Sequence, residues 1–330
     1  MKPYNAITDV PGIEVGQAQD EDALTGCTVI LCRKGAVGGV DVRGSAPGTR
    51  ETDLLNPINL VNKVNAIVLA GGSAFGLDAA SGVMKYLAEN NIGYGVGSVR
   101  VPIVPAAILF DLGIGNPSRH PDPEMGYAAV SSATSGPVAE GNAGAGTGAT
   151  IGKIFGFAGA MKSGLGTASI KLAGGVWVGA IVAVNAFGDV LDHLTGQIIA
   201  GARPAKFGPL VVGGAGKFAD TQKVMQTLTG RTILSLATSG NTVIGVVATN
   251  ARFIKAQAAK MAQMAQDGLA RSIRPAHTML DGDTIFALAT GQKKADVSIV
   301  GTYAAEAMSL AIVRAVRAAK TAGGLPGISE

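Results

Sequence analysis

The sequence is poor in cysteine, histidine, aromatic residues and charge. Of its 330 residues, two are cysteines and three are histidines, while aromatic residues make up 5% and charged residues 15%. Few charges together with 47% hydrophobic residues exclude an intrinsically disordered chain. The lysines and arginines are scattered, so the net charge of +4 indicates no nucleic-acid partner.

The two cysteines, Cys27 and Cys32, lie on one short apolar segment. If that segment is a strand, its side chains alternate between the two faces, which places the thiols on opposite sides. This disfavours a disulfide and a metal site, and it predicts buried free thiols in a reducing, cytoplasmic compartment. Because His120, His193 and His277 lack ligand spacing to one another and to the cysteines, we expect neither a metal nor another cofactor.

The chain also lacks a segment typical of a signal peptide or a membrane span. No apolar run follows Met1 to Tyr4, which predicts no signal peptide. The longest apolar run, Leu172 to Gly188, is rich in Gly and Val and contains Asn185. That composition is typical of buried strands, so we expect no membrane partner.

Glycine is abundant, with 48 residues, which indicates tight turns and close backbone approaches. The densest stretch, 140–153, lacks the Gly-Lys-Ser/Thr ending of a phosphate loop. It is either a surface loop or a backbone that approaches a ligand, with Lys153 supplying a positive charge. Residues 71–76 join a predicted strand, 65–70, to a helix. Their glycine spacing is not a dinucleotide fingerprint, and close strand–helix packing is favoured over anion binding.

Apolar periodicity predicts the other elements. Strands are expected at 26–31, 36–42, 176–184 and after residue 241, helices at 220–228, 255–270 and 302–320, and no regular element at 195–209.

The stretch Ser239-Gly240-Asn241 is a small polar turn that leads into an apolar, β-branched run. This pattern predicts a buried strand that begins at Thr242. If the bond before Thr242 were cut, its new α-amino group, with a pKa of about 7.7–8.0, would lie near its own hydroxyl. Threonine paired with its own amine is a known activated nucleophile. The alternative is a hairpin corner that enters a core strand.

Three further polar residues have both a chemical and a structural interpretation. Asn185, at the end of a predicted strand, is either an amide donor for an oxyanion or the start of a turn. Asp281 and Asp283 flank a glycine before another strand, where both carboxylates can face one site or cap an Asp-Gly turn. The further oxygen ligands of a calcium loop are missing.

Six ordered motifs, spread over nearly the whole chain, carry a resemblance to one enzyme family. They are Thr8–Ile13, Gly71–Leu77, Gly144–Ala149, Gly240–Thr242, Thr249–Arg252 and His277–Phe286. Together they resemble the P1 (S58) peptidase family, the group of the L-aminopeptidase/D-esterases and the β-peptidyl aminopeptidases. Nylon-oligomer endo-hydrolases belong to the same superfamily.

The resemblance implies an α/β fold for one domain, residues 1–330. This fold is a four-layer α/β/β/α sandwich with the layering of N-terminal-nucleophile hydrolases but a different connectivity. It also implies self-cleavage between Asn241 and Thr242, which gives an α chain, 1–241, and a β chain, 242–330. The two chains would stay together, and a homotetramer of such pairs is expected.

By the same resemblance, Thr242 attacks a substrate amide and its free amine shuttles the proton. Lys153, Asn185, Asp281 and Asp283 match residues around the nucleophile of the nylon hydrolases. Asn185 would donate to the oxyanion, and Lys153 would orient or polarise the Thr242 hydroxyl. The two carboxylates would hold Lys153 and the new ammonium, or bind a substrate amine.

Two more positions are expected to contact the substrate. The backbone near Gly148 is one, and Phe75, where the nylon hydrolases carry Tyr, is the other. The β-aminopeptidases carry a different pair at the positions of Asp281 and Asp283, so this chain departs from their pattern.

The leading hypothesis is therefore a self-processing, N-terminal-threonine aminopeptidase that cleaves short peptides or amino-acid amides through an acyl-enzyme on Thr242. The alternatives are a hydrolase of linear non-peptide amides of the nylon-oligomer type and an acyltransferase of the ornithine acetyltransferase type. In the latter, cleavage follows Ala instead of Asn241. A non-catalytic ligand-binding protein with glycine-rich loops is the remaining alternative.

Overall fold

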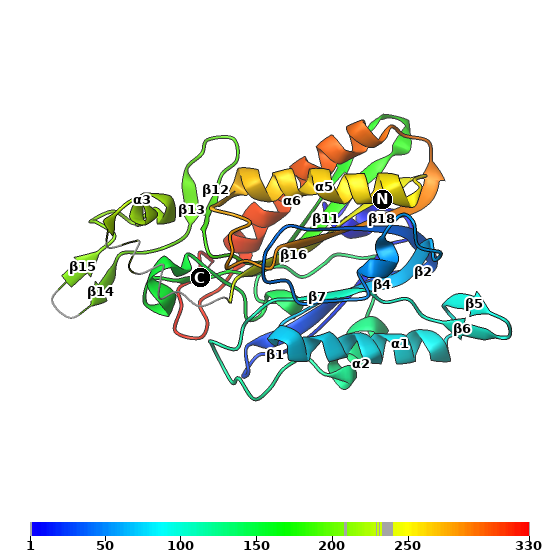
Figure 1. Cartoon of the computed structure of the whole chain (residues 1–330), viewed down its shortest axis with the longest axis horizontal. Helices are drawn as coiled ribbons and strands as arrows, with labels where there is room; N and C mark the ends of the chain where they lie inside the picture. The colour runs from blue at the N-terminus through cyan, green and yellow to red at the C-terminus, as the bar shows by residue number, and fades with distance from the viewer. Residues whose placement is uncertain (1, 208–209, 229, 231, 233–239, 330) are drawn as a thin grey trace.

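In the computed structural model, which describes residues 2–207, 210–228, 230, 232 and 240–329, strands and helices alternate along the chain (Figure 1). The strands are β1 (Glu14–Asp20), β2 (Thr25–Val42), β3 (Thr49–Arg50), β4 (Lys63–Ala70), β5 (Tyr94–Val96), β6 (Val99–Val101), β7 (Ala106–Ile108), β8 (Thr150–Ile151), β9 (Met161–Lys162), β10 (Leu165–Lys171), β11 (Trp177–Asn185), β12 (Asp189–Leu191), β13 (Ile198–Ala200), β14 (Ala205–Phe207), β15 (Leu210–Val212), β16 (Thr242–Ala251), β17 (Ile273–Arg274) and β18 (Thr284–Lys293). The helices are α1 (Ala79–Glu89), α2 (Pro123–Ser131), α3 (Thr221–Met225), α5 (Lys255–Ser272) and α6 (Val297–Ala318).

Nine of the described strands form one continuous sheet. Its order is β10-β11-β16-β18-β2-β4-β7-β3, and β1 pairs with β2 beside this path. Two neighbouring pairs are parallel, β16 with β18 and β4 with β7, and a helix lies between the strands of each pair in the sequence. The remaining pairs are antiparallel.

Strand β2 links two halves of this sheet. Residues 27–37 pair with β4, and residues 37–42 pair with β18. The prediction of two separate strands was wrong, because one strand of 18 residues continues through an irregularity between Leu31 and Ala36. The exposed polar residues there, with Gly35 at φ +71°, look like a turn in the sequence but form a bulge.

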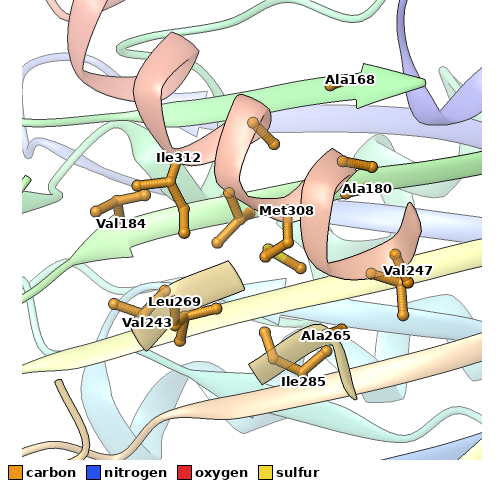
Figure 2. Close-up of a cluster of buried hydrophobic side chains, with 14 of the residues drawn as sticks. Ala168, Ala180, Val184, Val243, Val247, Ala265, Leu269, Ile285, Met308 and Ile312 are labelled. Carbon is orange, nitrogen blue, oxygen red and sulfur yellow. The ribbon is translucent and has the colours of Figure 1, made fainter. Parts of the chain in front are cut away.

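The two halves of the sheet stack face to face and give the predicted four layers, α/β/β/α (Figure 1). Helices α5 and α6 cover the half that contains β11, β16 and β18, and α1 with α2 cover the half that contains β4. Alternation along β16 explains this, because Val243 and Val247 face α5 and α6 (Figure 2) while Ile244 and Val246 face the inner layer. Each such side chain contributes about 1.5–3 kcal/mol when fully buried.

The two cysteines follow the same alternation along β2. Cys27 packs under α1 and α2, and Cys32 lies in the inner layer, so the predicted opposite faces and free, buried thiols are confirmed. Burial raises the pKa of both thiols to about 12.

The helix predictions hold with shifted ends. Helix α6 begins at Val297, earlier than predicted, because the Asp296 carboxylate accepts the N–H groups of Ser298 and Ile299 as its cap. By length and composition α6 is apolar enough to cross a membrane, but 67% of that window is buried in the protein. It packs against α5, β10 and β11, as a core helix does.

Of the two interpretations of the glycine-dense stretch 140–153, the surface loop is excluded for most of its length. Residues 143–152 are buried and form no surface loop, because neighbouring backbone packs directly on the glycines. A Cβ atom at Gly146 would lie 2.2 Å from the backbone nitrogen of Leu165. The stretch 195–209, predicted to be irregular, contains β13 and β14. The short helix predicted at 220–228 is confirmed as α3, while Ser239 lies outside the described residues.

Candidate active site

The candidate nucleophile, Thr242, is the first residue of β16, as predicted, and is 4% exposed. In the antiparallel ladder between β11 and β16 it lies directly opposite Asn185. Both side chains lie on the face that points to the inner layer, because they alternate with residues that contact α5 and α6. The ladder thus brings together two residues far apart in the sequence.

The carbonyl group of Asn241 lies against the nucleophile. The Thr242 hydroxyl Oγ1 is 2.5 Å from the Asn241 oxygen and donates to it. The backbone N–H of Gly282 donates to the same oxygen at 2.9 Å. This carbonyl therefore has a backbone donor on its oxygen and a hydroxyl beside it, which is the arrangement that polarises a carbonyl for attack.

Gly282 was missed by the sequence reasoning, which considered only the side chains of the two flanking aspartates. A Cβ atom at Gly282 would lie 2.9 Å from Thr242 Oγ1 and 2.5 Å from the oxygen of Ala46. Only glycine lets the turn approach the nucleophile this closely. The Asp-Gly-Asp sequence was the available signal, since glycine between two buried polar residues indicates a close backbone approach.

Asp283, 1% exposed, connects the start of β16 to His277. Its Oδ1 accepts the N–H of Val243 at 2.8 Å. Its Oδ2 accepts the backbone N–H of His277 at 3.0 Å and lies 2.8 Å from the ring nitrogen Nδ1. The carboxylate thus fixes the residue that follows the nucleophile. No role for His277 was evident from the sequence.

Asp281, 2% exposed, lies on the other side of Gly282. Its Oδ2 accepts the N–H of Thr278 at 2.9 Å and the Thr278 hydroxyl at 2.6 Å. Burial, and then the neighbouring charge of Asp283, raise the pKa of the Asp281 carboxyl. Both aspartates accept backbone N–H groups of the preceding turn, as the capping interpretation expects, and Asp283 also reaches Val243. That the two carboxylates serve one site stays a prediction.

Asn185 is fully buried and its amide is oriented by its partners. The oxygen Oδ1 accepts the N–H of Thr150 at 3.0 Å, its hydroxyl at 3.1 Å and Lys153 Nζ at 2.9 Å. Since the oxygen faces these donors, Nδ2 is the donor end. It donates to the oxygens of Phe110 at 3.0 Å and Gly240 at 3.3 Å.

Lys153 enters the site from a short 3-10 helix, Lys153–Ala158, which begins after Gly152 at φ +68°. Nζ donates to Asn185 Oδ1, to the Asn185 backbone oxygen at 3.2 Å and to the Gly240 oxygen at 3.3 Å. The residue is partly exposed, but its amine is enclosed by these oxygens. Burial lowers the pKa of Lys153 to about 7, against the opposing charges of Asp281 and Asp111. A neutral amine is thus accessible near pH 7.

Behind the site, Asp111 holds the glycine turn that follows β4. Its oxygens accept the Gly72 N–H at 2.6 Å and the Thr25 hydroxyl at 2.7 Å. Because the Gly72 N–H already donates to Asp111, it is not available to an anion. This favours the interpretation of the turn as close strand–helix packing. Burial raises the pKa of Asp111. A Cβ atom at Gly148 would lie 2.4 Å from the Asp111 Cβ, so this glycine allows the two segments to touch.

The predicted substrate contacts stay predictions. Phe75 is 62% exposed and its ring stacks on His120 with centroids 4.8 Å apart. Gly148 is buried against Asp111. Within the described part of the chain, no group of three or more His, Cys, Asp and Glu side chains gathers as a metal site would require.

Comparisons with known proteins show the family and the fold of this chain. The model of Peptidase family S58 matches residues 5–329. An uncharacterized aminopeptidase of Mycobacterium leprae is 44% identical over 98% of this chain and 93% of its own. A 6-aminohexanoate-oligomer endohydrolase of Kocuria is 31% identical over 94% of this chain and 85% of its own.

A solved structure has the same fold. The L-aminopeptidase D-Ala-esterase/amidase of Ochrobactrum anthropi, described as a variant among the Ntn hydrolase fold, superposes with a TM-score of 0.71 at 20% identity. The match covers 98% of this chain and 89% of that one. This supports the predicted layering and its variant connectivity.

Proposed function

The chain belongs to peptidase family S58 and is a hydrolase of peptide or amide bonds, and on this premise we propose that it cuts itself before Thr242 and then uses this threonine as its nucleophile. One observation carries the proposal. The carbonyl of Asn241 is held between the Thr242 hydroxyl and the Gly282 N–H. A hydroxyl beside a polarised carbonyl is the starting arrangement for an N-to-O acyl shift.

Self-cleavage proceeds in two steps. The Thr242 oxygen attacks the Asn241 carbonyl carbon, the C–N bond breaks, and the hydroxyl proton ends on the released Thr242 nitrogen. The product is an ester between Asn241 and Thr242 Oγ1. Water then hydrolyses the ester, which restores the hydroxyl and leaves Asn241 with a carboxylate. The Gly282 N–H stabilises the negative charge that develops on the carbonyl oxygen.

The precursor needs a base other than the Thr242 nitrogen, which is still an amide. We assign this role to the neutral form of Lys153, which keeps two of its three hydrogen bonds to Asn185 and Gly240 and has a lone pair to accept the proton. Asn185, its partner, lies opposite Thr242 in the ladder. After cleavage the free α-amine of Thr242 takes over, because its pKa of about 7.7–8.0 suits proton transfer near neutral pH. Thr242 then attacks the substrate amide, forms an acyl-enzyme and releases the amine product.

The test is the intact mass of the purified wild type and three variants. Wild type and Thr242→Ser, which keeps a hydroxyl, are expected to give two fragments that meet at Asn241 and Thr242. Thr242→Ala is expected to stay whole. Thr249→Ala is the matched control, because Thr249 is on the same strand and donates its hydroxyl to the Trp177 oxygen. It should be cut as wild type is.

A single full-length species in the wild type after long incubation would contradict the self-processing proposal. Two fragments in Thr242→Ala would contradict the assignment of the nucleophile. Turnover of aminoacyl amides by the cut wild type, and its loss in Thr242→Ala, would connect self-cleavage to catalysis.

A further inference from the structure

Lys162, on β9, is a second buried lysine near the site, and the proposed reaction does not use it. Its side chain is 0% exposed, and no carboxylate of the described residues lies within 4.0 Å of its amine. Burial lowers the pKa of Lys162 to about 7, while the charge of Asp111 opposes this shift. A buried charge is costly unless other groups bind it, so its hydrogen bonds indicate its role.

Three backbone carbonyl groups bind this amine. Nζ donates to the oxygens of Ser163 at 2.7 Å, Ala149 at 2.9 Å and Gly146 at 3.2 Å. These bonds use all three N–H groups of an ammonium. Carbonyl oxygens carry partial negative charge, so three of them converge on one buried point only where a donor or a cation lies. Since two of the three belong to the glycine-dense stretch 140–153, Lys162 fixes the path of that stretch.

The bond to Ala149 acts on a peptide unit that also contacts the site. The Ala149 carbonyl and the Thr150 N–H are the two ends of one planar unit, and in a trans unit they point in opposite directions. The oxygen accepts from Lys162, and the N–H donates to Asn185 Oδ1 at 3.0 Å. The two bonds together set the tilt of the plane. The Ser163 N–H donates to the same oxygen at 2.9 Å, so without Lys162 one donor would remain.

This peptide unit in turn orients the amide of Asn185. The Thr150 hydroxyl donates to Oδ1 at 3.1 Å, beside the bond from the Thr150 N–H. These donors separate the oxygen end of the amide from Nδ2, its donor end. Asn185 lies opposite Thr242 in the ladder and is expected to donate to the oxyanion. A tilt of the plane would therefore displace that donor.

We propose that Lys162 is a positioning residue, which holds the Ala149–Thr150 peptide unit and, through it, the donor end of Asn185. Its amine makes hydrogen bonds to neither Asn241 nor Thr242, so it acts through other residues. This inference rests on the proposed function. It also gives the glycine-dense stretch a role, which is to bring its carbonyl groups together around one amine.

The test compares Lys162→Met with Lys255→Met. Methionine is nearly as long as lysine and has no N–H donor. Lys255 is the matched control, since it is 4% exposed and its Nζ also donates to backbone oxygens, those of Leu54 at 2.9 Å and Asn59 at 2.8 Å. It follows the far end of β16, and a strand of 10 residues is about 30 Å long, so it lies remote from Thr242.

Timed intact mass gives the rate of self-cleavage and the cut fraction, and an aminoacyl p-nitroanilide that the wild type hydrolyses gives kcat and KM. Both substitutions are expected to lower the urea midpoint. In Lys162→Met, self-cleavage should slow and kcat per cut molecule should fall by at least about tenfold, with KM changed by less than about threefold. A displaced donor weakens the transition state more than it weakens substrate binding. Lys255→Met should keep both constants within about twofold.

Equal kcat values in the two variants, or a change confined to KM, would overturn the positioning role and leave Thr242 as the proposed nucleophile. A folded Lys162→Met that stays uncut, beside a normally cut Lys255→Met, supports the role. If Lys162→Met does not fold, Lys162→Gln, which keeps two N–H donors, is judged by the same criteria.

If neither Lys162 variant folds while Lys255→Met does, Lys162 serves stability alone and the proposal is wrong. An uncut wild type, or a cut wild type inert toward aminoacyl amides, would instead overturn the proposed function and the positioning role with it.

Discussion

At the scale of single residues, Asp283 holds the backbone that follows Thr242, the proposed nucleophile. One oxygen accepts the Val243 N–H, and the other accepts the His277 N–H and faces its ring. In Asp283→Asn, an NH2 group replaces one of these acceptors and meets a donor. We expect self-cleavage and kcat to fall by about 10²-fold or more, because small displacements of a nucleophile cost that much. Timed intact-mass measurements give the rate of self-cleavage, and the hydrolysis of aminoacyl amides gives kcat.

Asp296→Asn is the matched control for that change. Asp296 also accepts two backbone N–H groups, but it caps α6 and is exposed. Asparagine caps helices about as well as aspartate, so stability and cleavage should both match wild type. If Asp283→Asn also cuts itself at the wild-type rate, the geometric role of Asp283 is wrong.

If Lys153 is the base, the proposed self-cleavage has a pH dependence with a defined sign. Its pKa of about 7 means that the neutral fraction rises from about one tenth at pH 6 to about nine tenths at pH 8. Since only the neutral amine accepts a proton, the rate should rise through this window and then level off. Precursor made by cell-free synthesis and transferred into buffers of different pH provides the time courses.

Lys153→Arg tests the same assignment with a side chain that stays charged at every pH used. A guanidinium stays protonated, so it keeps a donor near Gly240 but provides no base. Self-cleavage should slow by about 10²-fold or more at every pH and lose its rise near pH 7. A wild-type rate that falls as the pH increases would show instead that the charged ammonium is the active form.

At the scale of secondary-structure elements, local sequence patterns predicted more of the fold than of the site. The polar turn before an apolar, β-branched run correctly predicted that β16 begins at Thr242. The partner of Thr242 across the ladder, Asn185, is 57 positions away, and no local pattern specifies that pairing. Local patterns singled out Lys153 and the two aspartates, but only the family resemblance placed them around Thr242. The Gly282 N–H was missed because a backbone donor has no signature of its own.

Some glycines are required where two helices or strands pack closely, and the glycine content alone does not show which ones. Helices α1 and α2 cross where Gly82 of one faces the chain of the other, and a Cβ atom there would lie 1.8 Å from the Pro123 oxygen. Gly82→Ala gains about 1 kcal/mol of helix propensity but must push the helices apart. We expect a net loss of about 1–3 kcal/mol in the free energy of unfolding, measured by urea denaturation.

Gly95→Ala serves as the control for this steric effect. A Cβ atom at Gly95, in β5, would meet only the end of the flexible Arg100 side chain, at 3.7 Å. Its effect on the free energy of unfolding should stay within about 0.5 kcal/mol. If Gly82→Ala were as mild, α1 and α2 would be free to separate, and the close crossing would not limit the residue size.

At the scale of the whole molecule, the proposed cut divides the sequence but not the architecture. Residues 242–330 would provide β16 and β18, which lie between β11 and β2 of the other chain in one sheet. The same residues provide α6, which packs on β10 and β11 of the other chain (Figure 2), and α5, which packs on β2. Each chain alone would expose an apolar sheet face and unpaired strand edges, so the two chains should separate only on unfolding.

This interlocking should make unfolding depend on protein concentration once the proposed cut has been made. When a cut molecule unfolds, two chains separate, so each tenfold dilution should lower its apparent stability by about 1.4 kcal/mol. Uncut Thr242→Ala lacks this contribution, while any further association of whole molecules affects both proteins alike. Urea midpoints measured over a hundredfold range of concentration should therefore fall more steeply for the cut wild type. Equal slopes, or chains that separate in native buffer, would contradict the assignment of β16 and β18 to an inseparable sheet.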